Sequence, residues 1–119
     1  METKEFLRRA LGDDGFYCVF ASHSAEDRRV QKFYDSVDAV LTTAYDLDKS
    51  GFDSYFALAT FEEAGSRKVT NVKSLRSFFL DLDCGPSKDY LNQSDAISAL
   101  RGFCGKLELP KPLLVNSGR

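Results

Sequence analysis

Two aspartates one residue apart, Asp81 and Asp83, have the residue type and spacing best suited to chemistry in this chain. They directly follow the apolar stretch Phe78–Leu80. In an extended strand, side chains alternate between the two faces, so both carboxylates would project from the same face. Mg²⁺ and Mn²⁺ prefer hard oxygen ligands, and two such ions can stabilise the attacking and leaving oxygens of a phosphoryl transfer. The spacing therefore predicts part of a divalent-metal site at Asp81 and Asp83.

A simpler interpretation is that the two acids open a solvated loop at the end of a strand. The apolar residues before the acids favour the metal site, because leaving an unpaired charge in apolar surroundings is costly. Two carboxylates this close also repel each other unless a cation or a proton lies between them. We therefore predict a catalytic and metal-binding role for both aspartates.

The hydrophobic pattern predicts the elements that would position this pair. Apolar residues at helical spacing predict helices over residues 3–11, 36–48 and 95–107, the last capped by Ser94. Compact apolar runs predict strands over residues 16–21, 55–61, 75–84 and 113–115, and the polar stretches 23–32 and 62–70 predict loops. This order predicts an α+β fold, with helices packed on a small mixed sheet, in a single domain spanning residues 1–119.

Composition narrows the class of protein. The chain has 119 residues, 43% of them hydrophobic, which suits one small globular domain. No apolar run approaches the roughly 20 residues needed to cross a bilayer, so we expect no membrane partner. The three cysteines lack C-x-x-C spacing, which predicts a reducing, cytoplasmic setting. The net charge of −2 lacks the basic excess of many nucleic-acid-binding proteins but leaves room for local phosphate contacts.

The segment Phe78–Gly85 (FFLDLDCG) resembles the first catalytic motif of the archaeo-eukaryotic primase superfamily, in its phage and plasmid primase–polymerase branch. Residues 55–61 are similar to the strand upstream of that motif. Lys88-Asp89-Tyr90 and the helix that follows are similar to the connection after it. Pro112–Arg119 (PLLVNSGR) is similar to the approach to the second motif, in which a strand runs into a Ser-Gly turn and then a histidine.

The resemblance implies template-directed nucleotidyl transfer that makes primers for DNA replication. The implied partners are a single-stranded DNA template, nucleoside triphosphates and a replicative helicase, in a bacterial or phage-infected cell. Asp81 and Asp83 would ligate Mg²⁺ or Mn²⁺. Arg67 lies in the basic segment between the upstream strand and the motif, where it belongs either to a solvated loop or to a contact with the template or a phosphate. Ser117, Gly118 and Arg119 would begin the triphosphate-binding turn, where backbone N–H groups and a guanidinium suit phosphate oxygens.

The chain departs from the family pattern in one important respect. The histidine of the second motif should follow Ser117 within a few residues, and a third acid should come later, but the chain ends at Arg119. His23, the only histidine, lies far upstream and does not match. The resemblance therefore implies a truncated catalytic domain whose two-metal site is completed by residues outside this chain. We expect the isolated fragment to be inactive in polymerisation.

Two other interpretations remain open at this stage. A phosphohydrolase of the haloacid-dehalogenase type also uses an apolar strand that ends in D-x-D, with the first aspartate as nucleophile and the second as acid–base. That motif usually lies near the N-terminus and is followed by Gly-Thr, whereas Cys84-Gly85-Pro86 follows here. The third interpretation is a non-catalytic module that packs against the rest of a replication protein.

Overall fold

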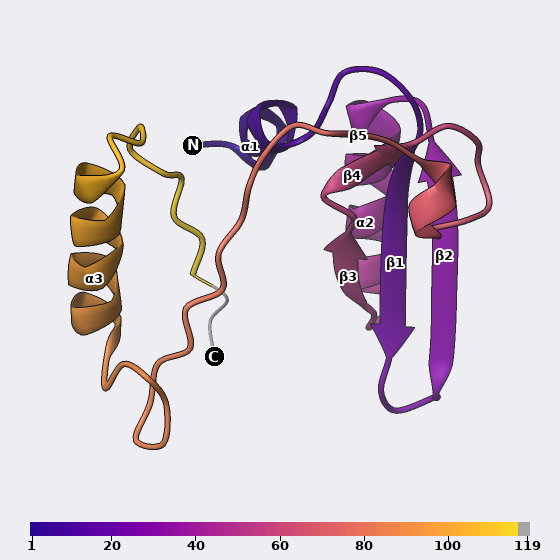
Figure 1. The fold of residues 1–119 in the computed structure, drawn as a ribbon. Coiled ribbons are helices and arrows are strands. Elements are labelled where there is room, and N and C mark those ends of the chain that lie inside the picture. Colours follow the sequence, from indigo (N-terminus) through magenta and orange to yellow (C-terminus); the bar gives the residue numbers. More distant parts are fainter. Residues whose placement is uncertain (117–119) are drawn as a thin grey trace. The chain divides into compact units, whose positions relative to one another are not determined.

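The computed structural model describes residues 1–116 and shows an α+β fold with two small antiparallel sheets (Figure 1). The chain divides into two compact units, which are described separately: the first is Met1–Phe78, and the second begins at Phe79. The first unit contains α1 (Thr3–Ala10), β1 (Tyr17–His23), β2 (Arg28–Tyr34), α2 (Val37–Lys49), β3 (Asp53–Phe56), β4 (Ala59–Phe61), the 3₁₀-helix η1 (Val69–Asn71) and β5 (Val72–Leu75). The second contains α3 (Gln93–Lys106).

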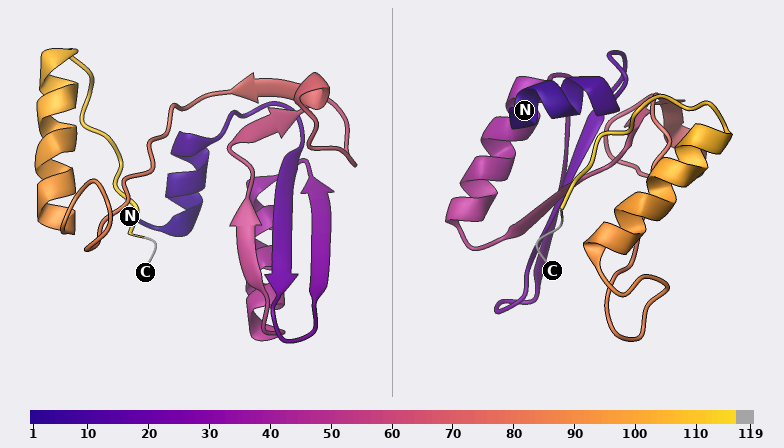
Figure 2. Two further views of the ribbon diagram at one scale, coloured as in Figure 1. Left: turned by 60° about the horizontal axis from the view of Figure 1, so that its bottom comes forward. Right: turned by 90° about the vertical axis from the view of Figure 1, so that its left-hand side faces the viewer.

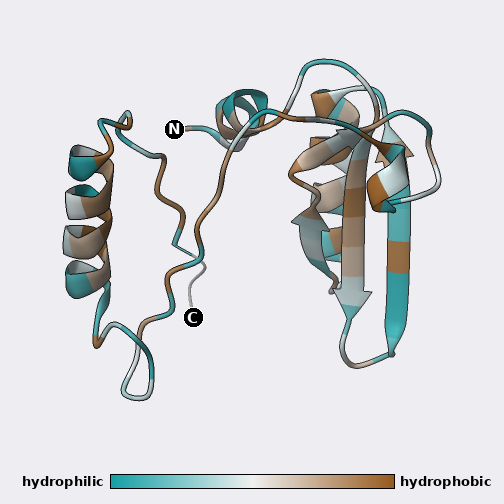
Figure 3. Cartoon of the chain, in the orientation of Figure 1, coloured by the Kyte–Doolittle hydropathy of each residue, from teal (hydrophilic) through white to brown (hydrophobic). Residues whose placement is uncertain are grey.

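A three-stranded antiparallel sheet, in the order β2-β1-β3, forms the centre of the first unit (Figure 2). β1 and β2 form a hairpin whose register runs from Tyr17 opposite Tyr34 to His23 opposite Arg28. In the turn, Asp27 has a φ of 49°, a left-handed conformation that aspartate tolerates better than most residues. The prediction of a loop over residues 23–32 was therefore wrong. Because β2 lies at the sheet edge and stays mostly exposed, its sequence is polar, with one apolar band (Figure 3).

Residues 55–61, predicted as one strand, form parts of two strands. β3 pairs with β1, whereas β4 pairs with β5 in a separate two-stranded sheet. The Thr60 and Ser74 hydroxyl oxygens lie 2.7 Å apart across this second sheet, which satisfies the fully buried Thr60 side chain. All strand pairs in both sheets are antiparallel, so the predicted mixed sheet is corrected to two antiparallel ones.

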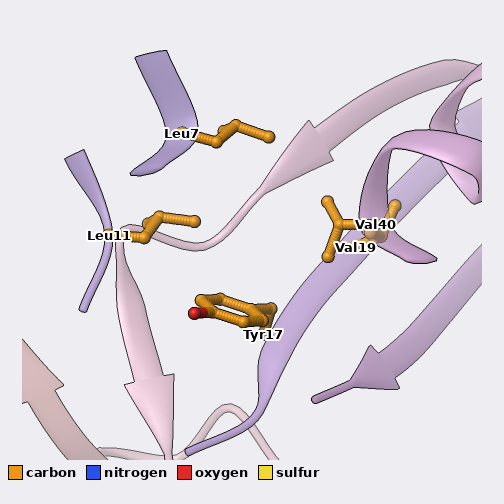
Figure 4. Close-up of a cluster of buried hydrophobic side chains, with 5 residues drawn as sticks. All are labelled: Leu7, Leu11, Tyr17, Val19 and Val40. Carbon is orange, nitrogen blue, oxygen red and sulfur yellow. The ribbon is translucent and has the colours of Figure 1, made fainter. Parts of the chain in front are cut away.

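The core of the first unit lies between the three-stranded sheet and the helices α1 and α2 (Figure 4). Its buried cluster comprises Leu7, Leu11, Tyr17, Val19 and Val40. Tyr17 and Val19 are two residues apart on β1 and therefore point to the same face of the sheet, the face that the helices cover. The predicted helices over 3–11 and 36–48 are confirmed as α1 and α2. Ser36 caps α2 by accepting a hydrogen bond from the Ala39 N–H at 3.2 Å.

In the second unit, the predicted helix over 95–107 is confirmed as α3, which begins slightly earlier. Asn92, rather than the predicted Ser94, is the cap, because its side-chain oxygen accepts a hydrogen bond from the Asp95 N–H at 2.9 Å. Ala96, Leu100 and Cys104 form the buried face of α3. These residues are four apart, close to the helical period of 3.6 residues, and belong to the apolar pattern that predicted the helix.

The predicted strands over 75–84 and 113–115 are corrected. β5 ends at Leu75, opposite the first residue of β4, so no neighbouring strand continues beside it. The next residues bind the end of α1 instead: Arg76 donates to the Leu11 carbonyl at 3.3 Å, and Ser77 donates to the Ala10 carbonyl at 2.8 Å. These carbonyls lack partners within α1. Within residues 1–116, neither 76–83 nor 113–115 belongs to a strand.

Tyr17 gives the first unit a pH-dependent stability. Burial, and then the nearby negative charge of Asp13, raises the pKa of Tyr17 above its usual 10.0, and Arg76 partly opposes this rise. The neutral phenol donates a hydrogen bond to the Gly12 carbonyl at 2.8 Å. Because the folded-state pKa is the higher one, this stabilisation is complete below the unfolded pKa and is lost as the pH rises through the folded pKa.

We expect the wild type to lose more free energy of unfolding than Tyr17→Phe when the pH is raised from about 8 to about 11. Urea denaturation followed by far-UV circular dichroism measures this difference. Tyr45→Phe is the matched control, since Tyr45 is 57% exposed on α2. Cys18, whose pKa burial also raises, is present in all three proteins and cancels in the comparison. Equal alkaline losses in the wild type and Tyr17→Phe would contradict the prediction.

Candidate metal site at Asp81 and Asp83

Asp81 and Asp83 lie in an irregular segment near the start of the second unit. Both aspartates are exposed, whereas Leu82 and Cys84 are half-buried. The three apolar residues before the acids, Phe78, Phe79 and Leu80, are also exposed, so the strand alternation and the apolar surroundings predicted for the pair are not found. Water and ions reach both carboxylates.

The loop that follows the two aspartates brings the side chain of Lys88 close to Asp83. The Gly85 N–H donates to the Tyr90 carbonyl at 2.8 Å, and the Lys88 N–H donates to the Gly85 carbonyl at 3.1 Å. Gly85 has a φ of 146°, a conformation that residues with a Cβ rarely adopt, so glycine is required at this turn. As a result, the Lys88 ammonium lies 3.5 Å from a carboxylate oxygen of Asp83.

This ion pair is weak, because both of its side chains are more than half exposed. A divalent cation has twice the charge of an ammonium and can displace it from Asp83. Lys88 would then carry a free positive charge beside the metal. Lys88 was not among the residues predicted for this site from the sequence. The available signal was its position two residues after the Gly85-Pro86 turn, which brings the chain back toward the acids.

The residues present could supply two ligands of a divalent-metal site. Two carboxylates match the hard oxygen donors that Mg²⁺ and Mn²⁺ prefer. Nowhere in residues 1–116 do three or more histidine, cysteine, aspartate or glutamate side chains gather as a complete metal-binding group. Mg²⁺ commonly binds through one or two carboxylates and completes its octahedron with water and substrate phosphates. The pair at Asp81 and Asp83 fits that pattern.

The other predicted site residues are not part of this pair. Arg67 belongs to the first unit, where its guanidinium carbon lies 4.8 Å from the ring centre of Phe20. Ser117, Gly118 and Arg119 lie outside the described residues. The structure therefore brings Lys88 to Asp83, the second acid of the pair, and places Arg67 on the surface of the first unit.

A second Asp-Leu-Asp sequence shows why local structure matters here. Asp46-Leu47-Asp48 has the same three residues but lies within α2. On a helix, residues two apart point in nearly opposite directions, so their carboxylates do not face one ion. Asp81 and Asp83 instead lie outside helices and strands, and both are exposed. The Asp46 and Asp48 pair is therefore a matched control for the proposed site.

Comparisons with known proteins identify no relative of this chain. No protein-family model, no curated protein and no solved structure matches the chain. Among the described helices, none is long and apolar enough to cross a membrane. The three cysteines, Cys18, Cys84 and Cys104, are free thiols.

Proposed function

We propose that the chain is part of a DNA primase–polymerase that joins nucleotides on a single-stranded DNA template to make primers for replication. One observation carries the proposal: the two acids of the FFLDLDCG motif are both exposed in a segment outside helices and strands, and Lys88 forms an ion pair with Asp83. In this proposal, residues 1–119 belong to one catalytic domain. The remaining metal ligands come from the rest of the full-length protein.

In this mechanism, the chain's own residues bind and orient. Asp81 and Asp83 would hold Mg²⁺ or Mn²⁺, which would stabilise the attacking and leaving oxygens of nucleotidyl transfer. Lys88, which lies beside Asp83, would contact phosphate oxygens of the incoming nucleoside triphosphate. Ser117, Gly118 and Arg119, which lie outside the described residues, would contribute to triphosphate binding, as the resemblance implies. The exposed position of both acids leaves room for substrate.

The proposed setting follows from the same activity. The partners are the DNA template, nucleoside triphosphates and a replicative helicase, in the cytoplasm of a bacterial or phage-infected cell. The free thiols are in keeping with a reducing compartment.

Mn²⁺ binding tests the metal assignment directly. Free Mn²⁺ has a strong paramagnetic resonance signal that falls when the ion binds protein. We expect the wild-type chain, mixed with a nucleoside triphosphate, to reduce this signal more than Asp81→Asn/Asp83→Asn does, because asparagine lacks the charge that Mn²⁺ favours. Asp46→Asn/Asp48→Asn removes the same number of charges from α2 and should behave as the wild type. If both double variants reduce the signal as the wild type does, the assignment is wrong.

A further inference from the structure

One face of the three-stranded sheet carries exposed aromatic and cationic side chains that the core does not use. Tyr17, Val19 and Ala21 of β1 are buried, and Tyr17 and Val19 belong to the helix-side core. Phe20 alternates with them and therefore points to the opposite face. In Figure 1, α2 lies behind β1, so this opposite face is turned toward the viewer.

Cross-strand register defines the residues of this face. Phe20 pairs with Tyr55 of β3 on one side and with Gln31 of β2 on the other. The adjacent row on the same face places Ser22 between Asp53 and Arg29. We name this surface the Phe20 face, and define it by Phe20, Tyr55, Gln31, Arg29 and Arg67.

The aromatic pair at its centre is accessible. The rings of Phe20 and Tyr55 lie 6.1 Å apart and are tilted by 41°. Tyr55 is 47% exposed, and Phe20 is half-buried. Aromatic rings on a sheet surface are the platforms on which many proteins stack the bases of single strands. Such stacking tolerates any sequence, because every base has an aromatic face.

This face carries two cations, Arg29 and Arg67, together with one carboxylate, Asp53 of β3. Arg67 places its guanidinium 4.8 Å from the centre of the Phe20 ring. In the part of the chain that the structure describes, neither Arg67 nor Arg29 forms an ion pair. A guanidinium held over a ring keeps its N–H groups available for a phosphate. Two such cations beside exposed rings complement a single strand of nucleic acid, in which bases and phosphates alternate. This local positive charge is present although the whole chain carries a net charge of −2.

We infer that the Phe20 face binds single-stranded nucleic acid, with a base stacked on Tyr55 and Phe20 and phosphates contacted by Arg67 and Arg29. This inference deepens the proposed function, on which it rests for the role of the strand as template. It uses none of the residues of the metal site. The binding surface and the catalytic assignment can therefore fail independently.

Fluorescence anisotropy of labelled single strands tests the inference on the 119-residue chain. The probes are oligothymidine and oligouridine of about 20 nucleotides, in low salt with a chelator present. We expect Tyr55→Thr to weaken binding by roughly 5-fold or more, because stacking of one base contributes about that much or more. Tyr55→Phe keeps the ring and should restore binding. Arg67→Gln should weaken binding and lower the salt dependence by about one phosphate contact.

Three controls separate this surface from other causes. Tyr45→Ala removes an exposed ring from α2, and Arg101→Gln removes an exposed cation from α3, so both should bind as the wild type does. Asp81→Asn/Asp83→Asn should also bind normally, which distinguishes strand binding from the metal site. Circular dichroism checks that Tyr55→Thr, which keeps a strand-forming residue, still folds. Absence of strand binding, or equal affinity of folded Tyr55→Thr and the wild type, would overturn the inference. Tighter binding of one probe would show whether the surface prefers DNA or RNA.

Discussion

Primer synthesis by the full-length protein should fall by roughly 10³-fold or more when Asp81 and Asp83 are both changed to asparagine, because metal ions contribute several kcal/mol to such transfers. Asparagine has nearly the size of aspartate but no charge, so the change removes a metal ligand with little change in shape. Both acids are exposed and lie outside helices and strands. Folding should therefore be unaffected, and the loss should be confined to catalysis.

The measurement is the rate of Mn²⁺-dependent primer synthesis on a single-stranded template, with circular dichroism as the folding control. Asp46→Asn/Asp48→Asn should retain the wild-type rate, because those acids lie on α2 and do not share a side. Near-wild-type synthesis by Asp81→Asn/Asp83→Asn would refute the catalytic assignment. Release of phosphate from a small phosphomonoester without primer synthesis would instead favour a phosphohydrolase of the haloacid-dehalogenase type.

The second large effect concerns the core of the first unit. Leu11 is 1% exposed and belongs to the cluster with Leu7, Tyr17, Val19 and Val40. Leu11→Ala should lower the free energy of unfolding by about 2–5 kcal/mol, since it removes buried methyl groups and leaves a cavity. Small domains are stable by only about 5–15 kcal/mol, so this change places the first unit near its unfolding threshold.

Urea denaturation followed by far-UV circular dichroism measures this loss. Leu75→Ala is the matched control, because it makes the same substitution in the same unit at a residue that is 54% exposed. That variant should lose no more than about 1 kcal/mol. Equal losses at Leu11 and Leu75 would show that the cluster does not carry the stability of this unit.

Local sequence was sufficient to predict the helices and the central strand. The periodicity of α1, α2 and α3 comes from their own buried faces, and Ser36 caps α2 through a hydrogen bond three residues along the chain. β1 is an apolar run because its first residues, Tyr17 to Val19, and Ala21 are buried, although Phe20 between them is only half-buried.

Tertiary structure alone decided which extended segments became strands. A strand needs a neighbour to hydrogen-bond, and the sequence of one segment does not state whether that neighbour exists. The polar β2 is a strand because β1 lies beside it, whereas the apolar residues after Leu75 have no continuing partner in β4. The contact of Arg67 with Phe20 likewise joins residues that chain folding brings together, whereas the contact of Lys88 with Asp83 comes from a local turn at Gly85. Thus the sequence determined the helices, the spacing of the acids and the turn beside them, and long-range hydrogen bonding determined the sheets and the surroundings of the Phe20 face.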